Sequence, residues 1–312
     1  MKYVVAGSAA ADCITFADGT CTGFVPGGAT LFALTGIQLW TDDVLMCGGF
    51  GADYMDQMGQ WMERNQIDRR AFNVRDPRNP LNYMFYRDEG GWDTKTVYGV
   101  EHYDSLDCNP RLDHLEDYLE GTVGLTIFRG RNPDFFQQIF ALRRRFGVKL
   151  NWEIKADYAV PEYLPELREM LQQVDSFSIN QPETFTLFGV DNDEDAIRCL
   201  RTLASPLIIY RVGKRGIYII KEQEVLFAPS YKKYPVVDVT GCGNSSTAAA
   251  FYAWCEEKDI YEIAAYANVT AAQNLRYYGA MELSAENKAL ARQEVAELTE
   301  ELRRTQTVRT IA

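Results

Sequence analysis

The sequence predicts an α/β fold with a mostly parallel central sheet flanked by helices. Short β-rich runs alternate with helical patterns along the 312 residues, as expected for a series of βαβ units. No internal repeat, low-complexity segment or Pro/Ser-rich linker marks a boundary, and 46% of the residues are hydrophobic, which provides for a sizeable core. We therefore expect a single domain over residues 1–312.

Short apolar runs rich in β-branched residues predict the core strands. The first run, Tyr3–Gly7, is similar to the apolar part of a secretory signal, but one Lys precedes it and Asp12 follows almost at once. We therefore interpret it as a buried strand. The expected core strands are Tyr3–Gly7, Val44–Gly48, Leu125–Phe128, Lys149–Trp152, Ser176–Ile179, Leu207–Arg211 and Gly216–Ile220.

Helical patterns occupy most of the intervals between these strands. The last of them carries an apolar stripe at helical spacing, formed by Leu290, Val295, Leu298 and Leu302. Such a stripe predicts that the helix packs against the sheet. The expected helices are Thr30–Trp40, Tyr54–Asn65, Pro133–Phe146, Pro161–Gln173, Asp193–Leu203, Ser245–Glu257, Tyr261–Tyr277 and Glu286–Arg304.

Two segments interrupt the alternation and predict β-hairpins. In the first, Ile14–Ala17 and Cys21–Val25 flank a turn, and in the second, Tyr83–Arg87 and Trp92–Val97 do the same. Hairpins that project from a parallel sheet often form a lid or an oligomer contact. Ordinary surface hairpins are the alternative. The lid hairpins are expected at about residues 13–26 and 82–100.

The charge balance restricts the class of partner. Lys and Arg number 32 against 44 Asp and Glu, which gives a net charge of −12. Because binding to a phosphate backbone or an anionic membrane surface needs an extended basic face, we expect neither nucleic acid nor a membrane as partner. A small anionic ligand needs only a local pocket. No other apolar run approaches the roughly 20 residues that a membrane span requires.

The cysteines and histidines argue against a metal centre. The seven cysteines are scattered, and no pair has C-x-x-C spacing, so we expect reduced thiols in a cytoplasmic protein. The two histidines lie in polar stretches, which makes a histidine metal cluster or a serine–histidine triad a poor expectation. These residues are Cys13, Cys21, Cys47, Cys108, Cys199, Cys242, Cys255, His102 and His114.

The strongest chemical signal is the segment 238–246, which reads DVTGCGNSS. It lies between a strand-like run, Tyr234–Val237, and a helix of small residues. A glycine-rich turn that leads into a helix aligns free backbone N–H groups with the positive helix end, which suits a phosphate or a developing anion. Taken alone, the segment is equally consistent with a plain turn capped by Asn or Ser.

Four further motifs strengthen the ligand-binding interpretation. Asn180 and Glu183 lie between a β-rich run and a helix, an arrangement that also suits a capping box. The segment 211–216, RVGKRG, joins two strands and places three cations beside two glycines, which suits a polyphosphate or a solvated turn. Asp12 comes just past the first strand, and Pro26-Gly27-Gly28 opens a helix. Four of the five motifs follow predicted strands, the place where ligands gather in open α/β sheets.

The order of these motifs resembles that of the PfkB family of sugar and nucleoside kinases. The family's closing signature, D-T-x-G-A-G-D, is similar to residues 238–244, with Cys in place of Ala and Asn at the last position. Its double glycine and G-x-G-x-D signature are similar to residues 27–28 and 49–53. Its N-x-x-E element matches residues 180–183, and its T-x-G-x-x-G loop is similar to residues 211–216, with Arg for Thr. The resemblance covers nearly the whole chain and implies a ribokinase-like fold with a small β lid.

The resemblance also implies an activity, namely transfer of phosphate from ATP, with Mg²⁺, to a hydroxymethyl group of a sugar, nucleoside or related small molecule. Asp12 would bind substrate hydroxyls, and Gly27 and Gly28 would let the backbone approach the substrate. The anion hole would be formed by Gly241, Cys242 and Gly243, next to Asn244 at the catalytic position.

The remaining implied residues concern the nucleotide and the ions. Asn180 and Glu183 would organise Mg²⁺ and its water shell around the phosphates. The nucleotide would be bordered by Arg211, Gly213 and Gly216, with Asn268 near the adenine. A monovalent cation such as K⁺, which some family members bind, would be held by Asp238, Thr240 and Ser284. The lid hairpins would cover the substrate and could pair two copies into a homodimer.

Asn244 is the main departure from the family pattern, because the family has there the Asp that takes the proton from the attacking hydroxyl. An amide cannot accept that proton, and loss of a general base typically costs about 10²–10⁴-fold in rate. Phosphoryl transfer depends mainly on positioning and charge neutralisation, and related vitamin kinases carry Cys at this position. Two hypotheses therefore stay open. The chain is a kinase that relies on its anion hole, or it is a catalytically silent relative that binds nucleotide or sugar.

The part of the sequence that would bind the acceptor also departs from the family pattern. Ala10 stands where ribokinases have Asn, and Phe32 stands where the double-glycine motif normally leads to Asn, so the acceptor need not be ribose. A nicotinamide-dependent Rossmann enzyme is a weaker alternative, because the segment 7–12, GSAAAD, lacks the G-x-G-x-x-G pattern.

Overall fold

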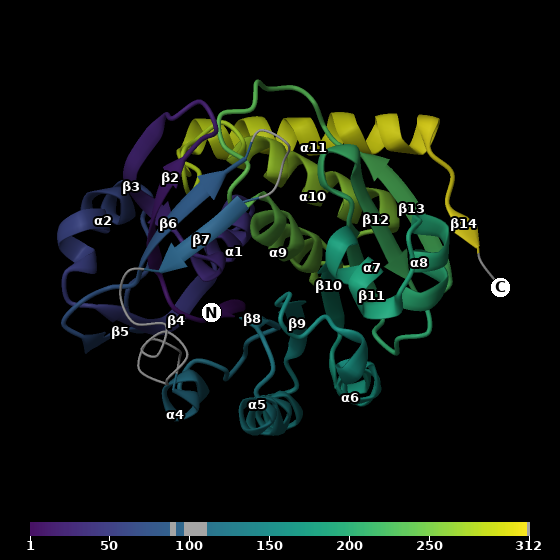
Figure 1. Cartoon of the computed structure of the whole chain (residues 1–312), viewed down its shortest axis with the longest axis horizontal. Helices are drawn as coiled ribbons and strands as arrows, with labels where there is room; N and C mark the ends of the chain where they lie inside the picture. Colours follow the sequence, from purple (N-terminus) through teal and green to yellow (C-terminus); the bar gives the residue numbers. More distant parts are fainter. Residues whose placement is uncertain (88–91, 97–110, 311–312) are drawn as a thin grey trace.

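A computed structural model of the chain describes residues 1–87, 92–96 and 111–310 (Figure 1). The strands of the large sheet are β1 (Tyr3–Ala6), β4 (Val44–Gly51), β5 (Phe72–Asp76), β8 (Gly124–Arg129), β9 (Lys149–Ile154), β10 (Ser176–Asn180), β11 (Leu207–Arg211), β12 (Gly216–Lys221), β13 (Glu224–Pro229) and β14 (Arg309–Thr310). Their order across the sheet is β14-β13-β12-β11-β10-β9-β8-β1-β4-β5. The strands from β11 to β5 run parallel, and β12 to β14 add an antiparallel edge.

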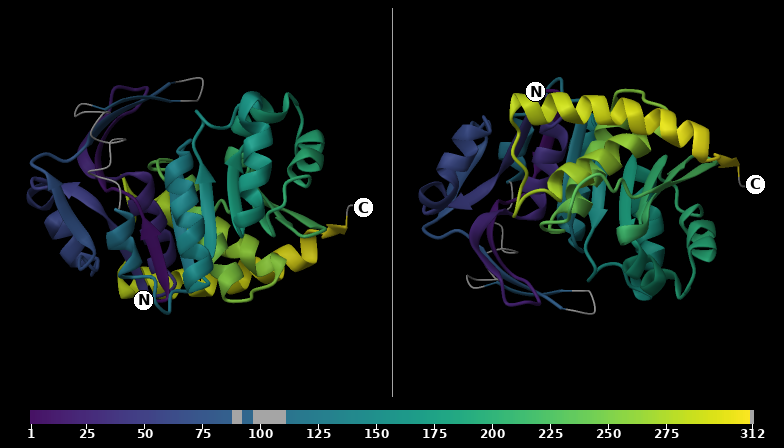
Figure 2. Two further views of the ribbon diagram at one scale, coloured as in Figure 1. Left: turned by 90° about the horizontal axis from the view of Figure 1, so that it is seen from below. Right: turned by 90° about the horizontal axis from the view of Figure 1, so that it is seen from above.

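Helices cover both faces of this sheet (Figure 1). One layer consists of α1 (Ala29–Gln38), α2 (Tyr54–Arg64), α9 (Cys242–Cys255), α10 (Ile260–Asn274) and α11 (Ala285–Thr305), and Figure 2 shows α11 along its outside. The other layer consists of α4 (Leu112–Glu116), α5 (Pro133–Phe146), α6 (Leu164–Met170), α7 (Gln181–Phe188) and α8 (Asp193–Leu200). Successive residues of a strand point to opposite faces, so in β1 Tyr3 and Val5 join the core under α9, whereas Val4 joins the core under α5.

A smaller sheet projects from one side of the body (Figure 2). Its strands are β2 (Ala10–Thr15), β3 (Cys21–Gly27), β6 (Leu81–Tyr86) and β7 (Trp92–Thr96). The strand order is β3-β2-β6-β7, with two antiparallel pairs joined by the parallel pair β2–β6. We call this four-stranded sheet the lid. Residues 88–91 and 97–100 of the second expected hairpin lie outside the described residues, as do His102 and Cys108.

The predicted α/β class is confirmed, and each predicted core strand overlaps a strand of the large sheet. The helix expected over Pro161–Gln173 is interrupted. Two short 3₁₀ turns, Pro161–Tyr163 and Leu171–Gln173, flank α6. Pro165 explains the first break, because proline has no N–H to donate to the carbonyl four residues earlier and is tolerated only in the first turn of a helix.

The strand expected at Tyr234–Val237 is absent, and these residues form an irregular connection. Pro235 has no N–H to donate to a ladder, and the side chain of Val236 is 63% exposed. The N–H of Val237 donates instead to the carbonyl of Leu275, at 2.8 Å. The segment that follows is therefore positioned by α10 rather than by a strand.

The helix expected from Ser245 begins three residues earlier, at Cys242. Glycine inside a helix is unfavourable, so the sequence pattern suggested a later start. No helix within the described ranges is long and apolar enough to cross a membrane.

Candidate active site

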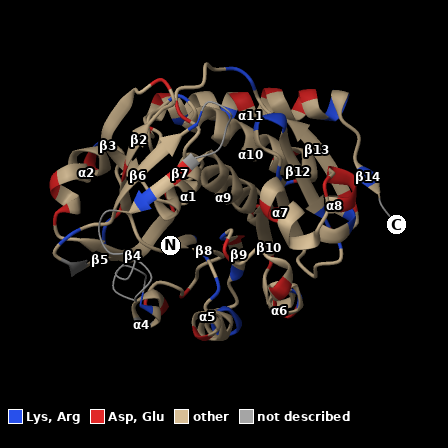
Figure 3. Ribbon diagram, viewed as in Figure 1, with Lys and Arg blue, Asp and Glu red and all other residues tan. Residues whose placement is uncertain are grey.

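The amino end of α9 forms the centre of the candidate site. Gly241 is its N-cap residue, with φ of 75°, and Cys242, Gly243 and Asn244 form the first turn. A Cβ on Gly241 would lie 2.0 Å from the Phe32 ring, so only glycine fits there. In the described part of the chain, the N–H groups of Gly243 and Asn244 have no hydrogen-bond partner. The positive end of an uncharged helix, drawn entirely tan in Figure 3, therefore offers free donors to an anion.

Arg211, at the end of β11, brings a cation to this helix end. A Cβ on Gly243 would lie 2.1 Å from Nη1 of Arg211, so the guanidinium packs directly on the first turn of α9. Nη2 of Arg211 lies 2.9 Å from Oε1 of Glu153, and the two side chains are only 16% and 6% exposed. The buried Nε of Arg211 has no hydrogen-bond partner among the described residues. The site therefore combines backbone donors with a guanidinium that is held in place and keeps one donor unused.

Asn180 and Glu183 form the capping box of α7 beside Arg211. The Asn180 side chain accepts from the Glu183 N–H, and Glu183 Oε2 accepts from the Asn180 N–H, both at 2.9 Å. Parallel register places Asn180 next to Arg211 in the sheet. Burial raises the pKa of Glu183, and the Arg211 charge opposes this rise. The structure thus brings Asn180, Glu183 and Arg211 together at the carboxyl ends of neighbouring strands.

Asp12 lies on β2, where the lid joins the body. Its side chain is 3% exposed, and Oδ2 accepts from the N–H of Gly28 at 3.1 Å. Oδ1 accepts from the Asn82 amide at 2.9 Å. A Cβ on Gly27 would lie 1.9 Å from Oδ2, so the turn can approach the carboxylate only as glycine. Burial raises the pKa of Asp12 from 3.8 to about 6, with Asp238 adding a smaller contribution.

Tyr86, on β6, closes the lid onto the turn before α9. Its hydroxyl lies 2.8 Å from Oγ1 of Thr240, and its ring stacks on Phe16 at a centroid distance of 5.8 Å. The Thr240 hydroxyl donates its proton to Oδ1 of Asp238 at 2.7 Å. The hydrogen bond between Tyr86 and Thr240 must therefore be donated by the Tyr86 hydroxyl. Burial, together with the nearby Asp238, Cys242 and Asp12, raises the pKa of Tyr86 to about 12.

Sequence reasoning missed Tyr86, Asn82 and Glu153. The spacing of Asn82 and Tyr86 along β6 puts both on one face of the lid, but the expected strand began only at Tyr83. Glu153 lies beyond the expected end of its strand at Trp152, so nothing in the sequence paired it with Arg211.

The residues expected around the nucleotide lie near the ends of β12 and β13. Gly216 pairs with Pro229, and the Asn268 amide, from α10, donates to the carbonyl of Pro229 at 2.9 Å. Gly213 adopts φ of 61° in the connection between β11 and β12. Of the cations in this connection, Arg215 pairs with Asp193 of α8. Gly216 and Asn268 therefore share one edge, and Arg211 lies at the other end of this connection.

The residues expected around a monovalent cation are only partly brought together. Asp238 is 1% exposed and accepts from Thr240 and from the N–H of Gly279, the latter at 3.1 Å. Ser284 is an exposed N-cap residue whose hydroxyl accepts from the N–H of Asn287 at 3.1 Å. Among the hydrogen bonds of the described residues, none joins Ser284 to Asp238. Within residues 1–87, 92–96 and 111–310, no group of three or more His, Cys, Asp or Glu side chains could hold a metal ion.

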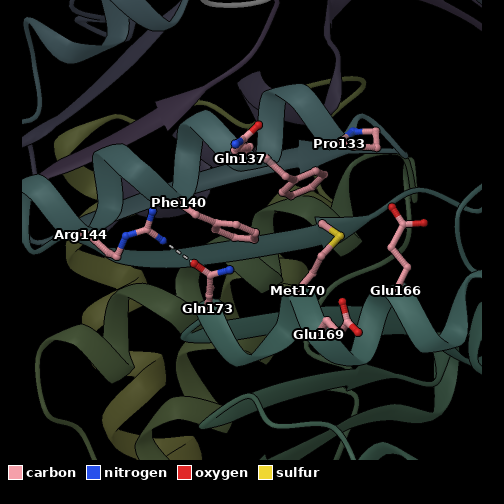
Figure 4. A pocket seen from close by; sticks show the side chains of 9 residues that line it. Pro133, Gln137, Phe140, Arg144, Glu166, Glu169, Met170 and Gln173 are labelled. Atoms are coloured by element: carbon pink, nitrogen blue, oxygen red, sulfur yellow. Dashed lines mark hydrogen bonds between the residues drawn. The ribbon is translucent and has the colours of Figure 1, made fainter.

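A separate surface pocket of about 280 Å³ lies between α5 and α6 (Figure 4). Phe140 and Met170 line it, and Arg144 donates to Gln173 across it at 2.6 Å. None of the catalytic, binding or metal-site residues predicted from the sequence lines this pocket. It therefore adds nothing to the site at the end of α9.

Comparisons with known proteins agree with the fold and with the family resemblance. Residues 1–288 match the pfkB family of carbohydrate kinases. An uncharacterised protein of Schizosaccharomyces pombe is 25% identical over 89% of this chain and 85% of its own length. A cytidine kinase of Thermococcus kodakarensis is 22% identical over 78% of this chain and 85% of its own.

Solved structures give the same fold. The adenosine kinase of Sinorhizobium meliloti has a TM-score of 0.76 at 15% identity, covering 94% of this chain and 98% of that one. The ribokinase of Arabidopsis thaliana, complexed with ribose and ATP, has a TM-score of 0.73 at 17% identity, covering 96% and 98%. The fold is thus ribokinase-like, and the chain belongs to the pfkB family of carbohydrate kinases.

Proposed function

We propose that the protein is a kinase that transfers the γ-phosphoryl group of ATP to a hydroxymethyl group of a sugar, nucleoside or related small molecule. The observation that carries the proposal is the contact between the Arg211 guanidinium and Gly243, where α9 presents free N–H groups. This arrangement places two sources of positive charge, the helix end and the guanidinium, next to each other. A transferring phosphoryl group needs such charge, because negative charge is spread over its oxygens in the transition state.

The other residues follow from their places around that point. Asp12 would hold acceptor hydroxyls against the backbone of Gly27 and Gly28, under the lid. Gly241, Cys242 and Gly243 would contribute backbone to the anion hole. Burial raises the pKa of the Cys242 thiol to about 12, so the thiol stays protonated at neutral pH. Its sulfur accepts from the Asn274 amide at 3.6 Å, which points to a packing role for the side chain.

The cofactors would bind at the amino end of α9, on the side away from the acceptor residues Asp12, Gly27 and Gly28. Glu183 has one carboxylate oxygen bound to the Asn180 N–H, which leaves the other for water of a bound Mg²⁺. Mg²⁺, when bound, would neutralise phosphate charge. Gly213, Gly216 and Asn268 would border the nucleotide, and Asp238 with Thr240 would contribute to a K⁺ site. A cytoplasmic location is also part of the proposal.

Asn244 favours a second candidate function, a catalytically silent protein that binds nucleotide or sugar. The amide lies in the first turn of α9, where the family's proton acceptor stands. The two candidates differ in whether ATP is consumed. A spectrophotometric assay of ADP formation, with Mg²⁺ and a panel of sugars and nucleosides, separates them. Acceptor-dependent ADP formation supports the kinase, and calorimetric binding without any ADP supports the silent protein.

A homodimer formed through the lid is a further part of the proposal. Phe24 and Phe85 lie on the lid face opposite Asp12 and are 41% and 43% exposed. Changing both to serine should convert a dimer into a monomer in light scattering, because burial of two phenyl rings would be lost. Val74→Ser, which alters an exposed apolar residue of β5, is the matched control and should stay dimeric. A natural protein that is monomeric at every concentration contradicts this expectation.

A further inference from the structure

Two cysteines face each other on the outer side of the lid. Sγ of Cys13, on β2, lies 3.3 Å from Sγ of Cys21, the first residue of β3. The ladder between the strands is irregular just there, between Cys13 and Thr15, and Gly23 adopts φ of 70°. This irregularity brings Cys21 diagonally across to Cys13, although the residue directly opposite Cys13 is Phe24. A disulfide bond needs sulfur atoms at about 2.0 Å, so the two sulfur atoms would have to approach each other by roughly 1.3 Å.

The two thiols are chemically different. Cys21 is exposed, and its pKa is lowered by a hydrogen bond from the N–H of Gly23 and by the side chains of Cys13 and Thr15. Cys13 is 6% exposed, and burial raises its pKa to about 11. An accessible thiolate attacks a disulfide, and a nearby second thiol resolves the mixed product once it has lost its proton. The lid hairpin holds both parts of that pair.

We propose that Cys13 and Cys21 form a dithiol site that reacts with small-molecule disulfides. The Cys21 thiolate attacks one sulfur of the small disulfide, which forms a mixed disulfide and releases one thiolate. Cys13 loses its proton and attacks the Cys21 sulfur as a thiolate, and the second small thiolate leaves and takes up a proton. Two protein thiols are thus oxidised to one disulfide, and the small disulfide is reduced to two thiols.

The bond would join the two strands that carry the acceptor residues. Asp12 precedes Cys13 on β2, Gly27 ends β3, and Gly28 is the N-cap residue of α1. Drawing the strands together next to Asp12 should raise the KM for the acceptor. This consequence rests on the proposed function, whereas formation of the disulfide does not.

The test uses the full chain and oxidised glutathione, followed by alkylation of free thiols and peptide mapping by mass spectrometry. The natural protein should lose two alkylatable thiols, with Cys13 and Cys21 recovered in one disulfide. The Cys13→Ser variant should instead keep one glutathione on Cys21, and the Cys21→Ser variant should leave Cys13 reduced. Cys199→Ser, which removes a partly exposed thiol on α8, is the control and should leave the reaction unchanged.

Two results would overturn the proposal. One is a natural protein that retains glutathione on Cys21 beside a free Cys13, which would mean that the pair cannot close. The other is oxidation at Cys199 while both lid thiols stay reduced. The readout is the final yield of disulfide rather than its rate. Because the readout requires no ADP formation, it stays informative even if the kinase activity is absent.

Discussion

Replacing Arg211 by methionine is expected to lower kcat by about 10³-fold, the lower end of the effect of removing a phosphate-stabilising arginine. The guanidinium lies on the first turn of α9 and is held there by Glu153, so its charge is in place before substrates bind. Methionine preserves much of the side-chain length but supplies no charge. The measurement is the steady-state kcat with the acceptor identified from the panel, at saturating ATP.

The control for this prediction separates catalysis from folding. Arg211→Met alone leaves Glu153 buried and unpaired, which typically costs about 3–5 kcal/mol of stability. Adding Glu153→Met removes the isolated charge and should restore most of the free energy of unfolding, measured with urea. The double variant should remain as slow as the single one. A recovery of kcat in the double variant would mean that Arg211 acts only through stability.

Changing Asp12 to asparagine is expected to weaken acceptor binding and to stabilise the protein at the same time. Hydrogen bonds to a charged group contribute about 1.5–3 kcal/mol, so the KM for the acceptor should rise about 10- to 100-fold. The Asn82 amide can turn over to keep a bond with the new side chain. The KM for ATP, whose proposed binding residues lie on other elements, should change little.

The stability gain follows from the raised pKa of Asp12, which burial shifts from 3.8 to about 6. The folded state therefore binds more protons than the unfolded state, and the free energy of unfolding falls as pH rises from about 4 to about 6. The full loss is about 3 kcal/mol, since one pKa unit corresponds to about 1.4 kcal/mol. Asp12→Asn should remove this loss at pH 8 and change little at pH 4.

Urea unfolding at the two pH values measures the effect of Asp12→Asn. Asp18→Asn, in the turn of the same hairpin, is the control, because hydrogen bonds from Thr20 lower the pKa of that exposed carboxylate. It should give no gain at pH 8. Equal gains from both changes would show that net charge, rather than burial of Asp12, determines the stability.

The alternation of strands and helices could be predicted from the sequence, because apolar runs and turn residues are local signals. The sequence placed Gly241, Gly243 and Asn244 at a helix end for the same reason. It failed at Tyr234–Val237, where β-favouring residues predicted a strand although Pro235 lacks a donor and no neighbouring strand was available. The β-favouring residues of this segment therefore did not form a strand, and the N–H of Val237 bonds to the carbonyl of Leu275 instead.

Contacts between distant elements could not be predicted in the same way. Arg211, on β11, contacts Gly243 of α9 and Glu153 of β9. The sequence suggested a cation in a turn, whereas the structure places this charge at the end of α9. The Tyr86 contact with Thr240 joins the lid to the body across 154 residues of sequence. Both contacts depend on side-chain direction in the assembled sheet, which no local pattern encodes.

The most direct test of the account is the single-turnover rate at which the γ-phosphoryl group of labelled ATP appears on the acceptor. The natural protein, Asn244→Asp and Asn244→Ala should be compared. We expect phosphorylated acceptor from the natural protein, a rate up to about 10²-fold higher from Asn244→Asp because a general base is restored, and a lower rate from Asn244→Ala. Absence of phosphorylated acceptor with all three proteins, while nucleotide or sugar still binds by calorimetry, would contradict the account and identify a binding protein.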